Sequence, residues 1–544
     1  MTKTLSSAVK SLLHKPESRS RRGIGELLTD AWRSLKVPRL KDKPRILRRL
    51  REGVSKPDYR RSMVGVGIVH IGPGKFFRAM IAPIADELIR KEAGGTKNWG
   101  VSAISLRSNS HDAKKQHYLY TLLERNSRDS ARIIGAVREY LHPDESVDSI
   151  VNRLADPAVK LVTMAITNAG YTFDSNGDLD LENRDIRHDL KNPTKPTTAI
   201  GVIAAGLKAR MEKGIDPCVI MSCDNIPPNG EITQSLVLEY IEELGDKDLL
   251  DYVSKKGMFP NTMADRIAPA ITPEYLRMVS EFTGIRDSQA VITEPYRQLI
   301  IQDLSDAHPN FRSCVGSLEA CEGVVLTKDV DKYALMKARL VNSAHVAVAW
   351  LATRVGLEYV HEVMHDETLG AFMAQVMKSE ILPTLNPING VKFEEYTDKV
   401  IDRFSNQALP DGIYRLNNNG FAKIRMRILN IVQDSLDAGK IPEGLILIVA
   451  CWMHSRHGLD EQGRVTVAPI EDIRALEKLK ACNTPDDYFN TSDLFRKKLI
   501  EDEDFRKALT KAFNLLGQMP LTEVIRKFYL DNTEIVERRR VVNG

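Results

Sequence analysis

The sequence lacks several features that mark special classes of protein. No uninterrupted apolar run in the 544 residues approaches the ~18 residues that cross a bilayer, so no membrane span or membrane partner is expected. Residues 1–13 are too short and too polar for a secretory signal. The six cysteines are few for this length and none has the CxxC spacing of a zinc site. Free thiols and a cytoplasmic location are therefore expected.

The N-terminal arm is poor in acidic and aromatic residues. Residues 1–62 contain eighteen Lys or Arg against six Asp or Glu, so the rest of the chain is net acidic. The arm fits an organellar presequence, a contact with an anionic surface or nucleic acid, or a solvated extension. Because aromatic residues that would stack on bases are nearly absent there, the solvated extension is favoured and nucleic acid is not expected.

A strand, a glycine turn and a helix follow the arm. Residues 63–72 form a β-branched run that ends at Gly72-Pro73-Gly74, and apolar residues then recur at helical spacing up to residue 89. This order is typical of the phosphate cradle of a dinucleotide fold, although Phe77 stands where a third glycine would lie. A second strand is expected at 99–106. Arg107 follows it in place of the usual acid, so this turn leaves open whether the cofactor is NAD or NADP.

Apolar runs then alternate with helical segments as far as residue 326. Runs at 159–167, 216–222 and 289–293 predict strands of a mostly parallel sheet, and the pattern becomes helical beyond Thr327. The chain is therefore predicted to be an α/β protein with a Rossmann-type N-terminal domain and a largely α-helical C-terminal domain. The expected divisions are a basic extension at 1–55, a dinucleotide-binding domain at 56–326 and a helical substrate or catalytic domain at 327–544.

One helix-like stretch carries polar residues that could perform chemistry. Residues 333–352 include Lys337, Asn342 and His345, which at about 100° per residue lie near 0°, ~140° and ~80° around a helix axis. Either they form a solvated polar face or they line one catalytic wall. The nearly all-apolar continuation through 346–352 favours burial, and hence the wall.

The chain resembles the polyol-specific long-chain dehydrogenases, the mannitol 2-dehydrogenase and fructuronate reductase family, over roughly residues 56–532. The motifs that carry this resemblance are GIVHIGPGKFFRA at 67–79, HYLYTLLER at 117–125, GDLDLENRDIRHDL at 177–190, SCDNIPPNG at 222–230, PNTMADRIAP at 260–269, TEPYRQ at 293–298, KxxxxNxxH from Lys337, and RFSN from Arg403. The resemblance implies a Rossmann domain joined to a helical domain, catalysis without a metal, and NAD as the cofactor, with NADP as the alternative.

The resemblance also implies a role for individual residues. Lys337 would be the base that takes the hydroxyl proton, which requires burial to lower its pKa. Asn342 and Asn225 would stabilise the negative oxygen, and His345 would place the substrate hydroxyls. The remaining implied residues are Asp265, Arg415 and Lys423 for the substrate, and Gly72, Gly74, Phe76, Arg78 and, from its place after the second strand, Arg107 for the cofactor. Asp265 could instead be an N-cap or pair with Arg266.

Two departures from the family pattern leave the substrate open. Asn168 and Ala169 replace an acidic residue in ITNAGY, and Ala334 stands where a Glu usually precedes the catalytic lysine. Without that Glu, Lys337 is expected to have no nearby carboxylate and a still lower pKa. Three functions compete: an NAD(P)-dependent polyol or ketose oxidoreductase, a sugar-acid reductase acting on a compound such as fructuronate, and a nucleotide-binding relative with weakened catalysis. A monomer or a dimer is expected.

Overall fold

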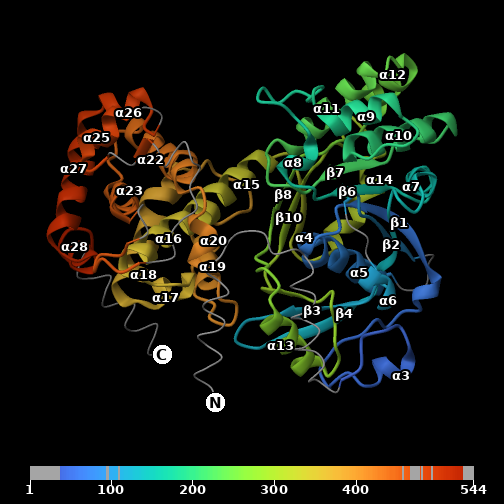
Figure 1. The fold of residues 1–544 in the computed structure, drawn as a ribbon, viewed down its shortest axis with the longest axis horizontal. Coiled ribbons are helices and arrows are strands. Elements are labelled where there is room, and N and C mark those ends of the chain that lie inside the picture. The colour runs from blue at the N-terminus through green and yellow to red at the C-terminus, as the bar shows by residue number, and fades with distance from the viewer. Residues whose placement is uncertain are drawn as a thin grey trace.

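The computed structural model describes residues 37–92, 97–107, 111–455, 459–465, 478–479, 482–491 and 494–530. A strand-containing half and a helical half lie side by side along the longest axis of the molecule (Figure 1). The expected extension falls outside the described residues up to position 36. Helical spacing in the sequence also predicts a helix at 475–480, of which only residues 478–479 are described. No helix among the described residues is long and apolar enough to span a membrane.

A five-stranded parallel sheet forms the centre of the first half. Its strands are β1 Val64–Ile71, β2 Lys97–Ile104, β5 Val137–Leu141, β6 Leu161–Met164 and β7 Val219–Ser222, in the order β5-β2-β1-β6-β7. Neighbouring residues of β1 point to opposite faces. Ile68 packs with α5 (Ile81–Lys91), whereas Val69 packs with α10 (Ala199–Glu212) and α11 (Asn229–Glu243). The topological switch point, where ligands bind in such sheets, lies between β1 and β6.

Two three-stranded sheets flank the parallel sheet, and neither was predicted. One contains β3 Tyr120–Glu124, β4 Ser130–Ile134 and β9 Val291–Thr293; the other contains β8 Thr262–Asp265, β10 Gln298–Gln302 and β11 Val324–Thr327. The run at 289–293 was expected in the parallel sheet, but β9 pairs with β3 in the separate sheet. Periodicity identifies a strand but not its partner, because pairing depends on residues far away in the chain.

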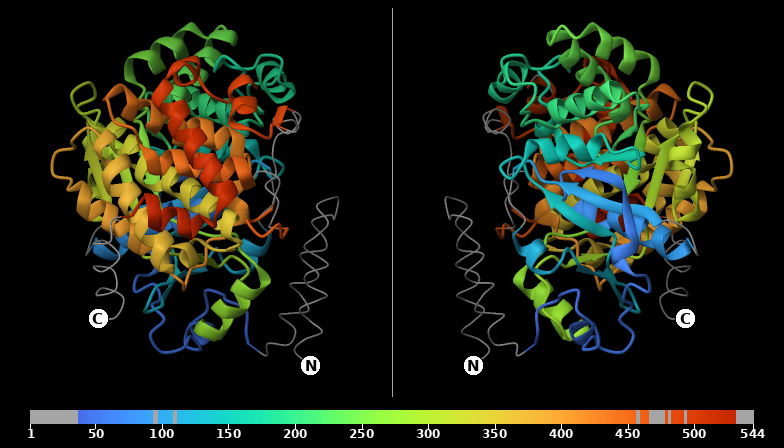
Figure 2. Two further views of the ribbon diagram at one scale, coloured as in Figure 1. Left: turned by 90° about the vertical axis from the view of Figure 1, so that its left-hand side faces the viewer. Right: turned by 90° about the vertical axis from the view of Figure 1, so that its right-hand side faces the viewer.

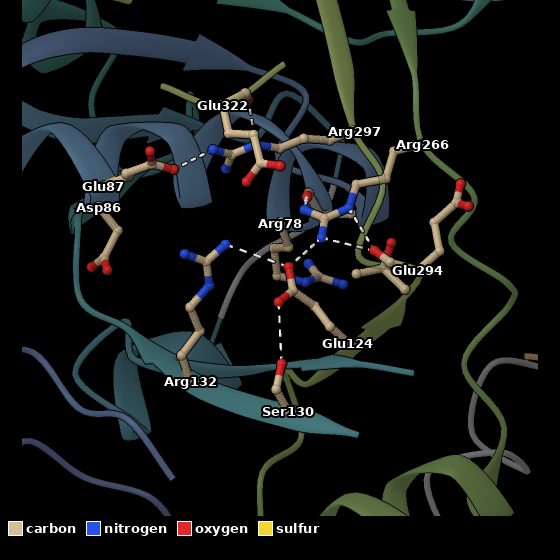
Figure 3. Close-up of polar contacts among 12 residues, drawn as sticks. Arg78, Asp86, Glu87, Glu124, Ser130, Arg132, Arg266, Glu294, Arg297 and Glu322 are labelled. Atoms are coloured by element: carbon tan, nitrogen blue, oxygen red, sulfur yellow. Dashed lines mark hydrogen bonds and ion pairs between the residues drawn. The ribbon is translucent and has the colours of Figure 1, made fainter. Parts of the chain in front are cut away.

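The helix expected at 75–91 is broken at Met80 into α4 (Lys75–Ala79) and α5. Pro83 lacks the N–H that would bond to the carbonyl of Ala79. Arg266 donates from Nη1 to that carbonyl instead, at 2.5 Å. Figure 3 shows the same guanidinium directed towards Glu124 of β3 and towards the backbone carbonyl of Glu294, which follows β9. Arg266 therefore links α4 to both three-stranded sheets.

The other elements of the first half are shorter or peripheral. They are α3 Pro44–Leu47, η1 Arg61–Met63, α6 His111–Lys115, α7 Val147–Leu154, α8 Asn168–Tyr171, α9 Arg184–Lys191, α12 Lys247–Lys256, α13 Pro273–Thr283, α14 Phe311–Val315 and η2 Gly316–Ala320. Residues 37–55 pack against the β3-β4-β9 sheet: Leu40 is buried with Leu119, Ile133 and Ile285, and Ser55 forms a bridge with Arg132.

The second half is built from helices around one large apolar core. These are α15 Val330–Lys337, η3 Ala338–Ser343, α16 Ala344–Val355, α17 Val360–His365, α18 Glu367–Gln375, η4 Val376–Ile381, η5 Leu382–Thr384, α19 Phe393–Phe404, α20 Ile413–Asn417, α21 Gly420–Lys423, η6 Ile424–Ile428, α22 Leu429–Asp437, α23 Glu443–Ser455, α25 Pro485–Asn490, α26 Lys497–Glu501, α27 Glu503–Gln518 and α28 Leu521–Phe528. Trp350 of α16 and Trp452 of α23 are fully buried and pack edge to face. The turned views of Figure 2 show these helices stacked on one side of the strand-containing half.

Candidate active site

A cavity of about 940 Å³ opens at the carboxyl ends of three strands of the parallel sheet. Gly72 and Gly74 follow β1, Ser105 to Arg107 follow β2, and Ala165 to Thr167 follow β6, and all of them line the cavity. This is the position at which a doubly wound sheet binds a dinucleotide. The volume is also large enough for such a ligand.

The two glycines of the turn are required for different reasons. Gly72 has φ +87°, and a Cβ there would lie 2.4 Å from the carbonyl oxygen of Ala165, so no other residue fits. Gly74 has ordinary backbone geometry, and a Cβ there would meet only the Gly72 oxygen at 3.8 Å. The space over Gly74 is therefore open to a ligand that approaches the backbone closely.

Charged side chains also line this cavity. Arg78 and Arg107 line it, as does Asp112 of α6. Arg78 is held by the carbonyl of Pro73, and its buried Nε has no hydrogen-bond partner in the described residues, which fits a polar ligand. Phe76 does not line the cavity; it packs against the core next to α5. Asp112 was missed because it comes six positions after β2 would be expected to end.

Lys337 lies at the junction of the two halves and is 8% exposed. Its ammonium donates to the carbonyl oxygen of Ala264 on β8 at 2.7 Å and to Oδ1 of Asn225 at 3.4 Å. Burial lowers the pKa of Lys337 below its ordinary value; the charge of Asp265 opposes this shift, while those of Arg427 and Arg403 add to it. The expectation of no nearby carboxylate was therefore wrong, because Asp265 acts on the amine from the neighbouring strand.

A π-helical segment places Asn342 beside Lys337. The helix is continuous from Val330 to Val355 but is wound as a π-helix at Ala338–Ser343. In such a segment residues five apart lie nearly on one face, whereas in an α-helix they diverge by ~140°. Lys337 and Asn342 consequently line one cavity of about 50 Å³, together with Asn225 and Ala334.

The loop that carries Asn225 is anchored on both sides. Asp224 accepts hydrogen bonds from the backbone amides of Ile166 and Thr167 and from the Tyr171 hydroxyl, at 2.8–3.0 Å. Asn229, 1% exposed, donates to the carbonyls of Ser222, Asp224 and Thr262 and accepts from the Thr262 amide. These two supporting residues were missed, although both lie in the SCDNIPPNG motif.

Asp265 pairs with Arg403 of α19, not with Arg266. Arg403 donates to Asp265 at 2.7 Å and in bidentate fashion to Glu294 at 2.8 Å, and lies 4.1 Å from the ring centroid of Tyr296. Burial opposes ionisation of both carboxyls, yet Arg403 holds the pKa of Asp265 below its ordinary value, while that of Glu294 remains raised. The network joins the two halves, and the RFSN and TEPYRQ motifs were the signals that could have revealed it.

His345 lies in a separate small cavity next to that network. It stacks on Phe404 at 3.9 Å between centroids, and its Nε2 lies 3.7 Å from Asp411. Burial lowers the pKa of His345 to about 4, so the ring is neutral. Nε2 makes no hydrogen bond in the described part of the chain, and the cavity around it is bordered by Glu294, Arg403 and Asp411. The structure therefore does not place His345 in the cavity of Lys337, although Asp265 interacts electrostatically with both.

The two other predicted substrate residues are engaged within the helical half. Arg415 donates to both oxygens of Asp411, at 2.8 and 2.6 Å, and its side chain is 58% exposed. Lys423 donates to the carbonyl of Leu416 at 2.7 Å. Neither lines the cavity of Lys337, whereas Arg427 of η6, which the sequence analysis missed, does. In the described residues no group of three or more His, Cys, Asp or Glu side chains is placed to hold a metal.

Comparison with known proteins agrees with this arrangement. Residues 66–313 match the mannitol dehydrogenase Rossmann domain, and residues 329–516 match the mannitol dehydrogenase C-terminal domain. A mannitol 2-dehydrogenase of Aspergillus fumigatus is 32% identical over 490 residues, covering 87% of this chain and 95% of the relative.

Two solved structures share the fold. A substrate-free D-sorbitol dehydrogenase is 25% identical with a TM-score of 0.80, covering 90% of this chain and 100% of the other. The mannitol 2-dehydrogenase of Pseudomonas fluorescens, in a ternary complex with NAD and D-mannitol, is 29% identical with a TM-score of 0.73, covering 90% and 99%. The chain belongs to the mannitol dehydrogenase family.

Proposed function

We propose that the protein is an NAD-dependent oxidoreductase that interconverts a polyol and a ketose in the manner of mannitol 2-dehydrogenase, with D-mannitol and D-fructose as the expected pair. The observation that carries the proposal is the buried Lys337 amine, in one cavity with Asn225 and Asn342 at the junction between the dinucleotide-binding and helical halves. The Aspergillus relative and the Pseudomonas structure, the latter solved with NAD and D-mannitol, support this choice of substrate and cofactor.

The chemistry follows from the contacts of these residues. Neutral Lys337 accepts the proton of the substrate hydroxyl, a role that its lowered pKa favours because a larger share of the amine is then unprotonated. Lys337 donates to Oδ1 of Asn225, which leaves the amide NH₂ of that residue as a donor to the substrate oxygen. Asn342 supplies a second donor, so negative charge on the oxygen is stabilised by groups already in place. NAD, bound at the glycine turn, would supply the hydride acceptor.

The remaining residues have supporting roles in this proposal. Asp265, held in position by Arg403, and His345 would bind substrate hydroxyls that extend beyond the cavity of Lys337. Arg415 and Lys423 do not line the cavity of Lys337, so in this proposal they would reach only the far end of the substrate. Gly72, Gly74, Arg78 and Arg107 hold the cofactor, and Phe76 acts through packing.

A sugar-acid reductase is the second candidate, because a carboxylate substrate needs a cation and Arg415 and Lys423 are the cations predicted for the substrate side. NADP is the alternative cofactor, because Arg107 lines the cofactor cavity.

We propose a domain division near residue 327, a basic extension at 1–55, and a monomer or dimer. A cytoplasmic location is proposed from the six cysteines, which are all free thiols in the structure.

The test is cofactor reduction with a panel of hexitols, pentitols and sugar acids, and cofactor oxidation with the matching ketoses and uronates, for the wild type and Lys337→Ala. We expect D-mannitol oxidation with NAD, and a loss of about 10²- to 10⁴-fold in kcat for the variant. NAD affinity, measured by titration calorimetry, should change little, because the glycine turn lies on the other half. NAD binding without turnover of any compound would support a weakened relative, and more than about a tenth of the wild-type kcat in the variant would exclude Lys337 as the base.

The pH profile provides an independent check. Because burial lowers the pKa of Lys337, kcat/KM for oxidation should rise with pH and level off below the ordinary lysine pKa of 10.5. A profile that still rises through pH 10 would contradict a desolvated base.

A further inference from the structure

A segment with a strained backbone lines the cofactor cavity directly after β6. Thr167 has φ +62° and ψ +162°, a conformation that is essentially restricted to glycine and is strained for a β-branched residue. Thr172, at the other end of α8, also has a positive φ, of +54°. Both threonines line the cavity, together with Ile166 and Gly170. A conformation of this kind persists only where the surrounding contacts hold it, and it is found mostly at functional sites.

The carboxylate of Asp224 holds this segment. Its Oδ2 accepts from the backbone amide of Ile166 at 2.8 Å and from the Tyr171 hydroxyl at 2.9 Å, and its Oδ1 accepts from the backbone amide of Thr167 at 3.0 Å. The two amides belong to the peptide units on either side of Ile166, so the carboxylate fixes the direction of both units. Tyr171 is fully buried, which makes it a rigid third contact.

Asp224 also borders the cavity of Lys337. It lines that cavity with Asn225, the residue that follows it in the chain. The backbone carbonyl of Asp224 accepts from the Asn229 side chain at 3.0 Å, so the loop is held from its other side as well. The side chain of Asp224 therefore holds the wall of the cofactor cavity, while its backbone carries the amide donor of the oxygen pocket. A shift at Thr167 is transmitted to Asn225 through this one residue.

We infer that Asp224 is a positioning residue, which keeps the wall of the cofactor cavity at a fixed distance from the oxygen-binding amides by holding Thr167 in its strained conformation. The inference rests on the proposed function, because the distance matters for hydride transfer between a carbinol carbon and the cofactor. Such a transfer depends steeply on geometry, and a displacement of about 1 Å can lower the rate by about 10²-fold.

The test compares Asp224→Asn with Asp366→Asn as the matched control. Asp366 is also a half-buried carboxylate that accepts from two backbone amides, those of Thr368 and Leu369 at 3.0 and 2.8 Å, but it is not among the residues that line either cavity. In Asp224→Asn an NH₂ group replaces one of the two acceptor oxygens and opposes a backbone N–H or the Tyr171 hydroxyl.

The first turnover with NAD and D-mannitol, followed by stopped-flow absorbance, separates a change of geometry from a loss of folded protein. For Asp224→Asn we expect the rate constant of NADH formation to fall about 10²-fold with its amplitude retained, and the NAD dissociation constant in calorimetry to change by no more than about threefold. A variant that had only lost folded protein would show a smaller amplitude at an unchanged rate constant. Asp366→Asn should keep the wild-type rate constant.

A double-mutant cycle with Thr167→Gly tests the strain itself. Glycine adopts a positive φ without steric cost, so Asp224 has less strain to oppose in this background. Asp224→Asn should therefore lower the urea midpoint by a smaller amount there, and the first-turnover rate constant by only about tenfold. The urea measurement needs neither cofactor nor substrate.

The inference would be overturned by an unchanged rate constant in Asp224→Asn, by an equal loss in Asp366→Asn, by a loss of NAD affinity as large as the loss in rate, or by strict additivity in the cycle. If Asp224→Asn does not fold, Tyr171→Phe decides: removing one of the three donors should lower the rate constant about fivefold, and a wild-type rate constant would refute the role. If the wild type oxidises no compound, the proposed function fails, and the urea cycle alone decides whether Asp224 holds Thr167.

Discussion

Replacing Arg403 with Met should destabilise the junction between the two halves. Arg403 is 7% exposed and binds Asp265 and Glu294, which are 6% and 3% exposed. Met fills much of the space over the Tyr296 ring but leaves two buried carboxylates without a cation. Breaking a buried pair in this way costs about 3–5 kcal/mol, and we expect at least this loss in the free energy of unfolding at pH 8.

The size of the loss should depend on pH in a defined direction. In the wild type Arg403 holds the folded-state pKa of Asp265 below its unfolded value, so this stabilisation is complete above the unfolded pKa and is lost only as the pH falls through the folded pKa. In the variant, unopposed burial would raise that pKa, so the folded state would bind more protons than the unfolded state. The difference in the free energy of unfolding between the wild type and the variant should therefore become smaller as the pH falls from 8 to 5.

Urea unfolding followed by tryptophan fluorescence measures this effect, because Trp350 and Trp452 report on the core of the helical half. Urea is preferred since it does not screen charges. Arg415→Met is the matched control, because Arg415 pairs with Asp411 but its own side chain is 58% exposed. Losing this exposed pair should lower the free energy of unfolding by no more than about 1 kcal/mol. If both variants lose the same small amount, or if the Arg403 deficit is equal at pH 5 and pH 8, the description of a buried ion network is wrong.

Further predictions concern the cofactor turn and the oxygen-binding amides. Asn225→Ala and Asn342→Ala should each lower kcat by about 10²- to 10³-fold, and the double variant should lose less than the product of the two losses if both amides bind one oxygen; strictly multiplicative losses would indicate separate roles. Gly72→Ala should abolish NAD binding in calorimetry, because a Cβ would lie 2.4 Å from a carbonyl oxygen; wild-type affinity would show that the turn can relax. Asp112→Asn and Arg107→Ala should shift the ratio of kcat/KM for NAD to that for NADP in opposite directions, the first towards NADP and the second towards NAD; unchanged ratios would place the adenosine ribose elsewhere.

Sequence patterns alone were sufficient for the parts of the fold that depend on neighbouring residues. The strand, glycine turn and helix from Val64 to Lys91, the helical second half and the buried helix that carries Lys337 were all predicted, because periodicity and glycine act within a few residues. The break at Met80 could also have been expected, since Pro83 removes a helical hydrogen bond.

The relation of His345 to Lys337 shows where local reasoning failed. A uniform helix places both on one wall, but the π-helical segment turns Asn342 towards Lys337 and leaves His345 in another cavity. The spacing of these residues does not predict a π-helical segment, because that winding depends on how the helix packs against its neighbours.

What the sequence by itself determined was therefore the identity of the two halves, the cofactor turn and the polar residues available for chemistry. Tertiary structure decided which of them meet. It placed β9 beside β3, Arg403 between carboxylates 109 and 138 positions away, and Arg427 in the cavity of Lys337. Local propensity acts over a turn or a strand, whereas these contacts join segments whose approach depends on the packing of the entire chain.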